Sequence, residues 1–159
     1  MNILFVCTGN LSRSYLAKML LKNELKNHQL KNISVSSAGT FAYPGTPADK
    51  EMVNYLIKAG LIAEEHEAKS LTREDVDWAD LILVMEKDHL RIIEDQWPMA
   101  KDKVELLAGY ISHDQIENDI IDPFGRSPYH YRLAQSQITL AVKSLFKKLR
   151  ADSKKNQNA

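Results

Sequence analysis

The sequence has little of what extracellular, membrane or nucleic-acid-binding proteins need. It contains a single cysteine, which excludes an intrachain disulfide and any zinc site built on several cysteines, and favours a reducing compartment. The apolar run at residues 3–6 is too short for a signal peptide or a membrane span. Basic and acidic residues number 21 each, so the basic excess of a general nucleic-acid binder is missing. We therefore expect a cytoplasmic protein without nucleic-acid or membrane partners.

What remains is the composition of an ordinary globular protein of one domain. Its 159 residues are 44% hydrophobic and 26% charged, enough for one sizeable core. We assign residues 1–150 to this domain. Residues 151–159 are polar and have nothing to bury, so we expect them to be a disordered tail.

Strand-like and helix-like segments alternate along the chain. Short apolar runs predict buried strands at residues 3–6, 33–35, 81–85 and 104–107. Apolar residues at helical spacing predict helices at residues 15–25, 47–59, 89–94 and 134–149. This alternation predicts an α/β fold with a parallel sheet covered by helices on both sides. Ligands of such sheets bind at the carboxyl ends of the strands, so the segments that follow the strands are the first candidates for a site.

The segment after the first strand has the composition of a phosphate-binding loop. Cys7 ends the strand, and Arg13 follows six positions later where the first helix begins. Short residues between them allow consecutive N–H groups to point inward and bind an anion; these are Thr8, Gly9, Asn10, Leu11 and Ser12. Arg13 adds a planar fork for two phosphate oxygens. The positive electrostatic field of these N–H groups, the helix start and Arg13 also favours a Cys7 thiolate, to which the Ser14 hydroxyl could donate. A thiolate in this position predicts attack on phosphorus through a phosphocysteine.

Such a reaction also needs an acid, and Asp122 is the candidate. A tyrosine oxygen leaves slowly as a bare anion, because its solution pKa is near 10. Asp122 precedes Pro123 in a loop before the last helix, and the proline restricts the backbone there. We expect the carboxyl to protonate the leaving group and then to deprotonate the attacking water. The resulting activity should have a bell-shaped pH dependence weighted toward mildly acidic pH.

Several motifs in this order resemble the low-molecular-weight protein tyrosine phosphatases along nearly the whole chain. They are residues 6–10 with Arg13 and Ser14, then residues 37–40, 66–71, 79–83 and 122–125. The resemblance implies a three-layer α/β/α sandwich with a four-stranded parallel sheet and the phosphate-binding loop between the first strand and first helix. It also implies hydrolysis of phosphotyrosine in protein substrates, with no metal and no cofactor.

By the same resemblance, Cys7 is the nucleophile, Arg13 binds the phosphate, and Asp122 is the general acid and then base. Asn10 is expected to organise the loop in a strained conformation, with hydrogen bonds to Ser14, Ser37 and His66. The substrate ring is expected to lie between two aromatic walls, Tyr43 and Phe124.

One departure from the family concerns oxidation of the site. Ser12 stands where many members carry a second cysteine, so no neighbouring thiol can trap an oxidised Cys7. We expect peroxide to drive Cys7 toward irreversible oxidation or mixed disulfides.

Other activities remain as alternatives. The nearest is the protein arginine phosphatase branch of the same fold, whose members tend to have threonine at the position of Leu11. The segments at residues 38–42 and 124–125 look similar to that branch, whereas the apolar Leu11 favours tyrosine. Arsenate reduction is disfavoured because its disulfide relay needs further cysteines. A phosphocysteine carrier domain of a sugar transport system and a non-catalytic phosphotyrosine-binding protein are less favoured, because neither needs Asp122. We expect a monomer or weak dimer.

Overall fold

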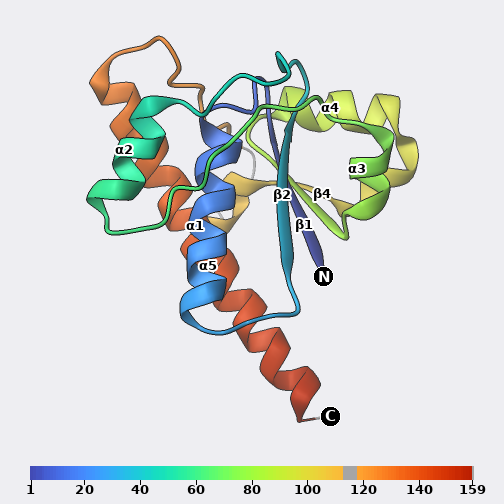
Figure 1. Cartoon of the computed structure of the whole chain (residues 1–159). Helices are drawn as coiled ribbons and strands as arrows, with labels where there is room; N and C mark the ends of the chain where they lie inside the picture. Colours follow the sequence, from blue (N-terminus) through green and yellow to red (C-terminus); the bar gives the residue numbers. More distant parts are fainter. Residues whose placement is uncertain (113–117, 159) are drawn as a thin grey trace.

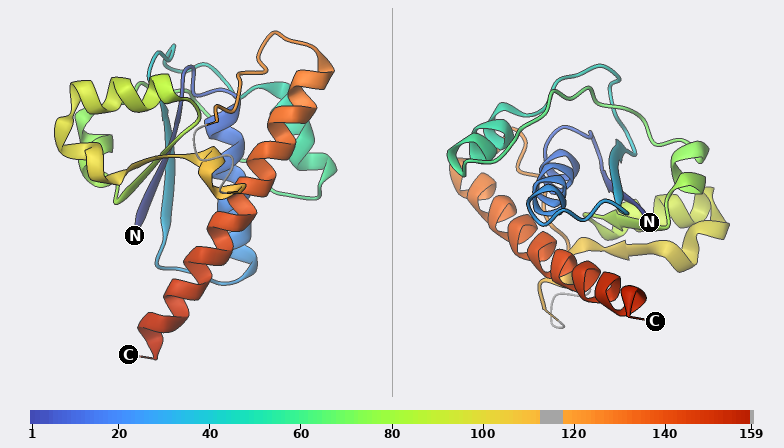
Figure 2. Two further views of the ribbon diagram at one scale, coloured as in Figure 1. Left: turned by 180° about the vertical axis from the view of Figure 1, so that it is seen from behind. Right: turned by 60° about the horizontal axis from the view of Figure 1, so that its bottom comes forward.

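The computed structural model describes residues 1–112 and 118–158, and within them four parallel strands form one sheet. The strand order is β2-β1-β3-β4, with β1 (Asn2–Cys7), β2 (Ser34–Gly39), β3 (Leu81–Val84) and β4 (Val104–Leu106). One face is covered by α1 (Arg13–Asn27), α2 (Lys50–Lys58) and α5 (Pro128–Gln157), and the other by α3 (Arg73–Trp78) and α4 (Lys87–Gln96) (Figure 1, Figure 2). Two 3₁₀ helices, η1 (Pro98–Lys103) and η2 (Leu107–Tyr110), flank β4. The expected three-layer α/β/α sandwich is confirmed.

The central strand β1 shows why the sequence forms this sheet. Its side chains alternate between the two faces, so Ile3 and Phe5 pack into the core beneath α1 and α5 while Leu4 and Val6 pack into the core beneath α3 and α4. All four are fully buried. Each such side chain contributes about 1.5–3 kcal/mol when it leaves water, and only a strand apolar on both faces collects this gain twice.

The carboxyl ends of the strands bring the following loops together at one edge of the sheet. The N–H of Phe41, after β2, donates to the carbonyl oxygen of Thr8, after β1, at 2.9 Å. The N–H of Ile120 donates to the carbonyl oxygen of Met85, after β3, at 2.8 Å. Gly39 makes the first of these approaches possible, because a Cβ there would lie 2.5 Å from the Thr8 carbonyl oxygen. The topology therefore gathers the candidate residues at this edge.

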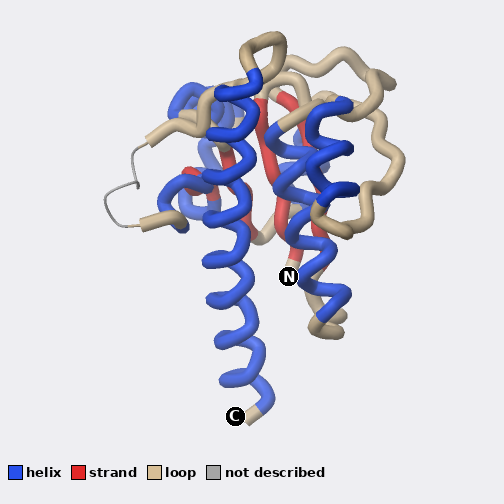
Figure 3. Tube along the Cα trace, turned by 90° about the vertical axis from the view of Figure 1, so that its left-hand side faces the viewer, coloured by secondary structure: helices blue, strands red, loops and turns tan. Residues whose placement is uncertain are grey.

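The C-terminal segment differs from the expectation of a disordered tail after residue 150. Helix α5 continues to Gln157 and projects beyond the body of the protein (Figure 3). Extending an existing helix adds one hydrogen bond for each residue that is ordered, so the long amphipathic helix continues through residues 151–157 although they are polar. Ala151, Lys154 and Lys155 are good helix formers. Residue 150 is thus no structural boundary, and Ala159 lies outside the described residues.

Helix α3 was not predicted from the sequence. Its six residues offer no extended apolar face, and its start is fixed by a capping box between Thr72 and Asp75. No helix within residues 1–112 and 118–158 is long and apolar enough to cross a membrane.

Candidate active site

The loop between β1 and α1 places a buried thiol beside a buried hydroxyl. Cys7 is the last residue of β1, Ser14 lies in the first turn of α1, and the Cys7 sulfur is 3.0 Å from the Ser14 hydroxyl oxygen. Both residues are buried. The chain returns on itself within six residues, which brings the end of the strand and the start of the helix into direct contact. A hydroxyl in this position can donate to a thiolate.

Asn10 holds the loop in shape. Its φ of 58° lies in the left-handed region, which asparagine tolerates better than most residues, and its side chain is fully buried. The amide nitrogen donates to the hydroxyls of Ser14 and Ser37, both at 2.9 Å, and the amide oxygen accepts from the Lys69 N–H at 3.0 Å. The Asn10 carbonyl oxygen lies 2.6 Å from Nε2 of His66. The hydrogen bonds expected for Asn10 are all present, and Lys69 adds one that was not foreseen.

Arg13 is a buried cation with a donor left over. Its side chain is 1% exposed, and Nη1 donates to Glu86 at 2.8 Å and to the Ile120 carbonyl at 2.6 Å. Nη2 is buried and has no hydrogen-bond partner within residues 1–112 and 118–158; the Asp122 carboxylate lies 3.6 Å away. Leaving a buried donor unpaired costs about 1–3 kcal/mol, and more for a charged group. An anion bound in the loop would remove that cost.

Glu86 and His89 bind side chains of the loop, Glu86 through Arg13 and His89 through Thr8. Neither residue was identified from the sequence. The Glu86 N–H donates to Nδ1 of His89 at 3.1 Å, so the ring proton lies on Nε2, which donates to the Thr8 hydroxyl at 2.8 Å. Burial, and next the charge of Arg13, lower the pKa of His89 to about 4, so the ring is neutral at physiological pH. Only their position after β3 could have drawn attention to them.

Asp49 ties the loop to two helices and was also missed. Its carboxylate accepts from the hydroxyls of Ser12 at 2.5 Å and Tyr131 at 2.7 Å, and from the Glu51 N–H at 3.0 Å, which caps α2. Burial and the Asp49 carboxylate raise the pKa of Tyr131. Asp49 before an amphipathic run is a typical helix-capping signal, but its contacts with the loop depend on the tertiary fold.

Asp122 lies beside Arg13, and the two predicted aromatic walls are exposed rings. The Asp122 side chain is 45% exposed and accepts from the Phe124 N–H at 3.2 Å, which fixes the turn around Pro123. Phe124 is 57% exposed and Tyr43 is 74% exposed, so neither ring belongs to the core. Phe41, which was not predicted, is also exposed and packs edge-on against Tyr43 at a centroid distance of 6.1 Å. The role of these rings as substrate walls stays a prediction.

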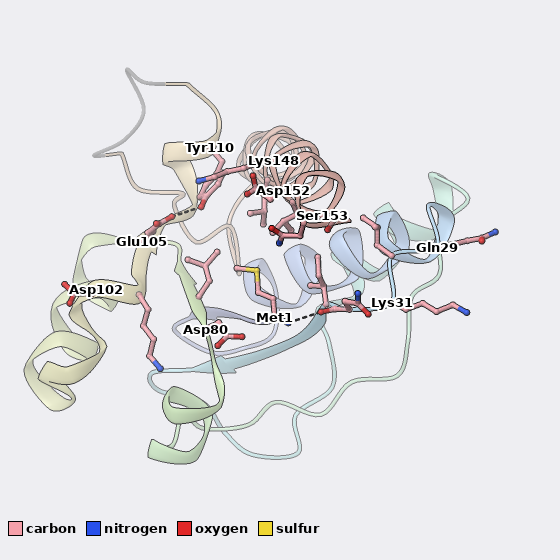
Figure 4. A pocket seen from close by; sticks show the side chains of 18 residues that line it. Met1, Gln29, Lys31, Asp80, Asp102, Glu105, Tyr110, Lys148, Asp152 and Ser153 are labelled. Carbon is pink, nitrogen blue, oxygen red and sulfur yellow. Dashed lines mark hydrogen bonds between the residues drawn. The ribbon is translucent and has the colours of Figure 1, made fainter. Parts of the chain in front are cut away.

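A cavity lies at the end of the sheet opposite the Cys7 loop. This cavity of about 770 Å³ is lined by Met1, Asp80 and Leu81 near the starts of β1 and β3, and by Tyr110 and Lys148 among others (Figure 4). Its lining mixes both signs of charge, and the Tyr110 hydroxyl is already bonded to Glu105 at 2.6 Å. Within the described part of the chain, no group of three or more His, Cys, Asp or Glu residues is arranged to hold a metal ion. Neither Cys7 nor Arg13 lines this cavity.

Comparison with known proteins decides the family. The family model for low molecular weight phosphotyrosine protein phosphatase matches residues 2–155. The chain belongs to this family. A protein-arginine-phosphatase of Geobacillus stearothermophilus is 37% identical, covering 94% of this chain and 97% of its own. A probable low molecular weight protein-tyrosine-phosphatase of Ralstonia nicotianae is 34% identical, covering 94% and 96%.

Solved structures give the same result for the fold and identify the active site of a relative. A YwlE arginine phosphatase is 35% identical with a TM-score of 0.87, covering 96% of this chain and 97% of its own. That protein was solved as a cysteine-to-serine mutant with a phosphorylated active-site serine. Its phosphorylated side chain is consistent with a phosphocysteine mechanism in the family.

Proposed function

We propose that this protein hydrolyses phosphotyrosine in proteins through a phosphocysteine on Cys7. The observation that carries the proposal is the arrangement of Cys7, Ser14 and Arg13 in the loop between β1 and α1. A buried sulfur lies 3.0 Å from the Ser14 hydroxyl, in the loop that leads to a buried guanidinium whose Nη2 lacks a partner among the described residues. A phosphate dianion would satisfy the unpaired Nη2 donor of Arg13 and the loop N–H groups that the sequence predicts to point inward, and would place phosphorus in front of the sulfur.

The proposed reaction has two steps. In the first, the Cys7 thiolate attacks phosphorus, the bond to the leaving oxygen breaks, and the protonated Asp122 carboxyl gives its proton to that oxygen. In the second, Asp122 takes a proton from water, the water oxygen attacks phosphorus, and the S–P bond breaks to release phosphate and the thiolate. Arg13 and the loop N–H groups bind the three equatorial oxygens in both steps. The steps use no metal or cofactor.

A second candidate substrate is phosphoarginine. The relative from Geobacillus stearothermophilus and the structural neighbour described above are both named arginine phosphatases. In favour of tyrosine, the apolar Leu11 side chain lies over Gly9 in the loop, where a Cβ on Gly9 would be 3.7 Å from its Cγ. The exposed rings of Phe41, Tyr43 and Phe124 also suit a phenyl group.

The test compares kcat/KM on matched peptides that carry phosphotyrosine, phosphoarginine or phosphoserine. We expect the wild-type protein to prefer phosphotyrosine, and Leu11→Thr to lower the ratio of phosphotyrosine to phosphoarginine turnover. Leu140→Thr is the control, because Leu140 is an exposed leucine in the middle of α5. A wild-type preference for phosphoarginine that Leu11→Thr leaves unchanged would transfer the assignment to the arginine branch.

We also infer a cytoplasmic setting and a monomer or weak dimer. The single cysteine supports the reducing compartment. Analytical ultracentrifugation across a range of protein concentrations tests the oligomeric state, and a tight dimer at low concentration would contradict the inference.

A further inference from the structure

Resting on the proposed function, we propose that Lys18 is a positioning residue for the active-site loop. Its ammonium group donates to Nδ1 of His66 and thereby fixes the ring proton on Nε2, the atom that holds the carbonyl of Asn10. Lys18 lies on α1, one turn after Ser14. Among the described residues, its ammonium group is hydrogen-bonded to His66 and not to Cys7 or Arg13.

The contacts form a short chain from the helix surface into the loop. Nζ of Lys18 is 3.0 Å from Nδ1 of His66, and Nε2 of the same ring is 2.6 Å from the carbonyl oxygen of Asn10. The His66 ring also packs against Tyr15, with centroids 4.9 Å apart. Both nitrogens of the half-buried ring are therefore engaged, and its plane is held by a third residue.

The chemistry of the partners permits one arrangement of protons. An ammonium group has donors and no acceptor, so Nδ1 must offer its lone pair to Lys18. A carbonyl oxygen can only accept, so Nε2 must carry the hydrogen. A proton on Nδ1 would face the ammonium with no acceptor between them. Lys18 therefore selects the neutral Nε2–H form of His66.

The surroundings of the pair leave Lys18 charged and His66 neutral at pH 7. The pKa of Lys18 is lowered to about 8, chiefly by burial and next by Lys22, with a further lowering by Lys69, whereas Glu64 raises it. Burial also lowers the pKa of His66, the hydrogen bond to the Asn10 backbone opposes this, and Lys18 adds to the lowering. A charged lysine beside a neutral histidine is thus the state at neutral pH, and acid breaks the contact when His66 takes up a proton.

The consequence for the loop comes through Asn10. Its backbone is in the left-handed region, and its side chain holds Ser14, which contacts the Cys7 sulfur. The hydrogen bond from His66 holds the Asn10 carbonyl in the orientation that this backbone conformation requires. Losing the donor form of His66 would loosen the loop at the residue that shapes it.

The test observes His66 directly, by ¹⁵N–¹H correlation NMR of the ring nitrogens, with His66→Gln used to assign the signals. We expect the neutral Nε2–H form in the wild-type protein at pH 7. The pKa of His66 should rise in Lys18→Met, which removes the donor, and rise further in Lys18→Glu, which offers an acceptor to Nδ1. Lys18→Arg should keep the wild-type form, as should Lys26→Met, which removes an exposed charge from the same helix.

Activity on a small aryl phosphate tests the effect on the loop. We expect kcat/KM to fall about tenfold in Lys18→Met and to be largely restored in Lys18→Arg, the change expected from loss of one hydrogen bond to a charged group. An Nδ1–H or fully protonated His66 in the wild-type protein at pH 7 would overturn the proposal, even if every variant failed to fold. A changed His66 signal with kcat/KM within twofold of wild type would also overturn it. Absence of any phosphatase activity in the wild-type protein would refute the proposed function and leave the NMR result standing.

Discussion

Replacing Asn10 by alanine and by glycine separates two contributions of this residue to the loop. Either change removes three hydrogen bonds of the side chain, to Ser14, Ser37 and the Lys69 N–H. At about 1 kcal/mol each, their loss lowers the free energy of unfolding by about 3 kcal/mol. Alanine must also adopt the φ of 58°. Since glycine adopts this conformation without a steric penalty, Asn10→Ala should be less stable than Asn10→Gly by about a further 1 kcal/mol.

Gln29 is the matched control. It is the other non-glycine residue with positive φ among the described residues, at 57°, and it is exposed at the end of α1. The free energy of unfolding should again be higher in Gln29→Gly than in Gln29→Ala by about 1 kcal/mol. The loss of about 3 kcal/mol that both Asn10 variants share should be absent from both Gln29 variants.

Urea unfolding measures both pairs of variants, and turnover of an aryl phosphate reports on the loop. We expect both Asn10 variants to lose activity, because Ser14 loses the partner that orients its hydroxyl toward Cys7. Equal stability of Asn10→Ala and Asn10→Gly would refute the role given to the backbone conformation. A loss below about 1 kcal/mol in both would refute the role given to the hydrogen bonds.

Three further predictions concern the acid, the buried histidine and oxidation. Asp122→Ala should slow hydrolysis of esters with poor leaving groups by about 10²–10⁴-fold and those with good leaving groups much less, and equal effects on both would contradict the role of the acid. The pKa of His89 is lowered to about 4 from an ordinary 6.5, so the unfolded chain binds more protons than the folded protein between these two pH values, and the free energy of unfolding should fall as pH drops from 6.5 to 4. In His89→Gln, urea unfolding should show a shallower fall with pH, and a pH dependence equal to that of the wild-type protein would contradict this role of His89. Peroxide should inactivate the protein through irreversible oxidation or mixed disulfides of Cys7, and mass spectrometry showing full recovery by thiols without a mixed disulfide would argue otherwise.

The sequence was most informative where a short segment carries both its own conformation and its own chemistry. The run at residues 81–85 is apolar on both faces, which is enough to predict a buried parallel strand. Cys7 and Arg13 are six positions apart in one loop, so their proximity follows from local geometry and a helix start. For these residues, the folded structure changes little in the prediction.

Residues that act through tertiary contacts could not be found in this way. Glu86 lies 73 positions from Arg13 and His89 lies 81 positions from Thr8, yet each pair is hydrogen-bonded. Nothing in the segment around His89 distinguishes it from a surface histidine, although it is 2% exposed. Lys18 has the same property, because its importance depends on a ring 48 positions away. The helical tail was mispredicted for a related reason: residues 151–157 are polar and have no apolar face of their own, and they continue the helix that precedes them.

The central claim is that phosphate passes through the sulfur of Cys7, and trapping the intermediate tests it most directly. Asp122→Ala removes the base for the second step, so the phosphorylated protein should accumulate when a substrate with a good leaving group is added and the reaction is quenched rapidly. Peptide mapping by mass spectrometry should then find one phosphoryl group on Cys7. Under the same conditions, Cys7→Ser should release no product. A phosphoryl group on any other residue, or substantial turnover by Cys7→Ser, would contradict the account.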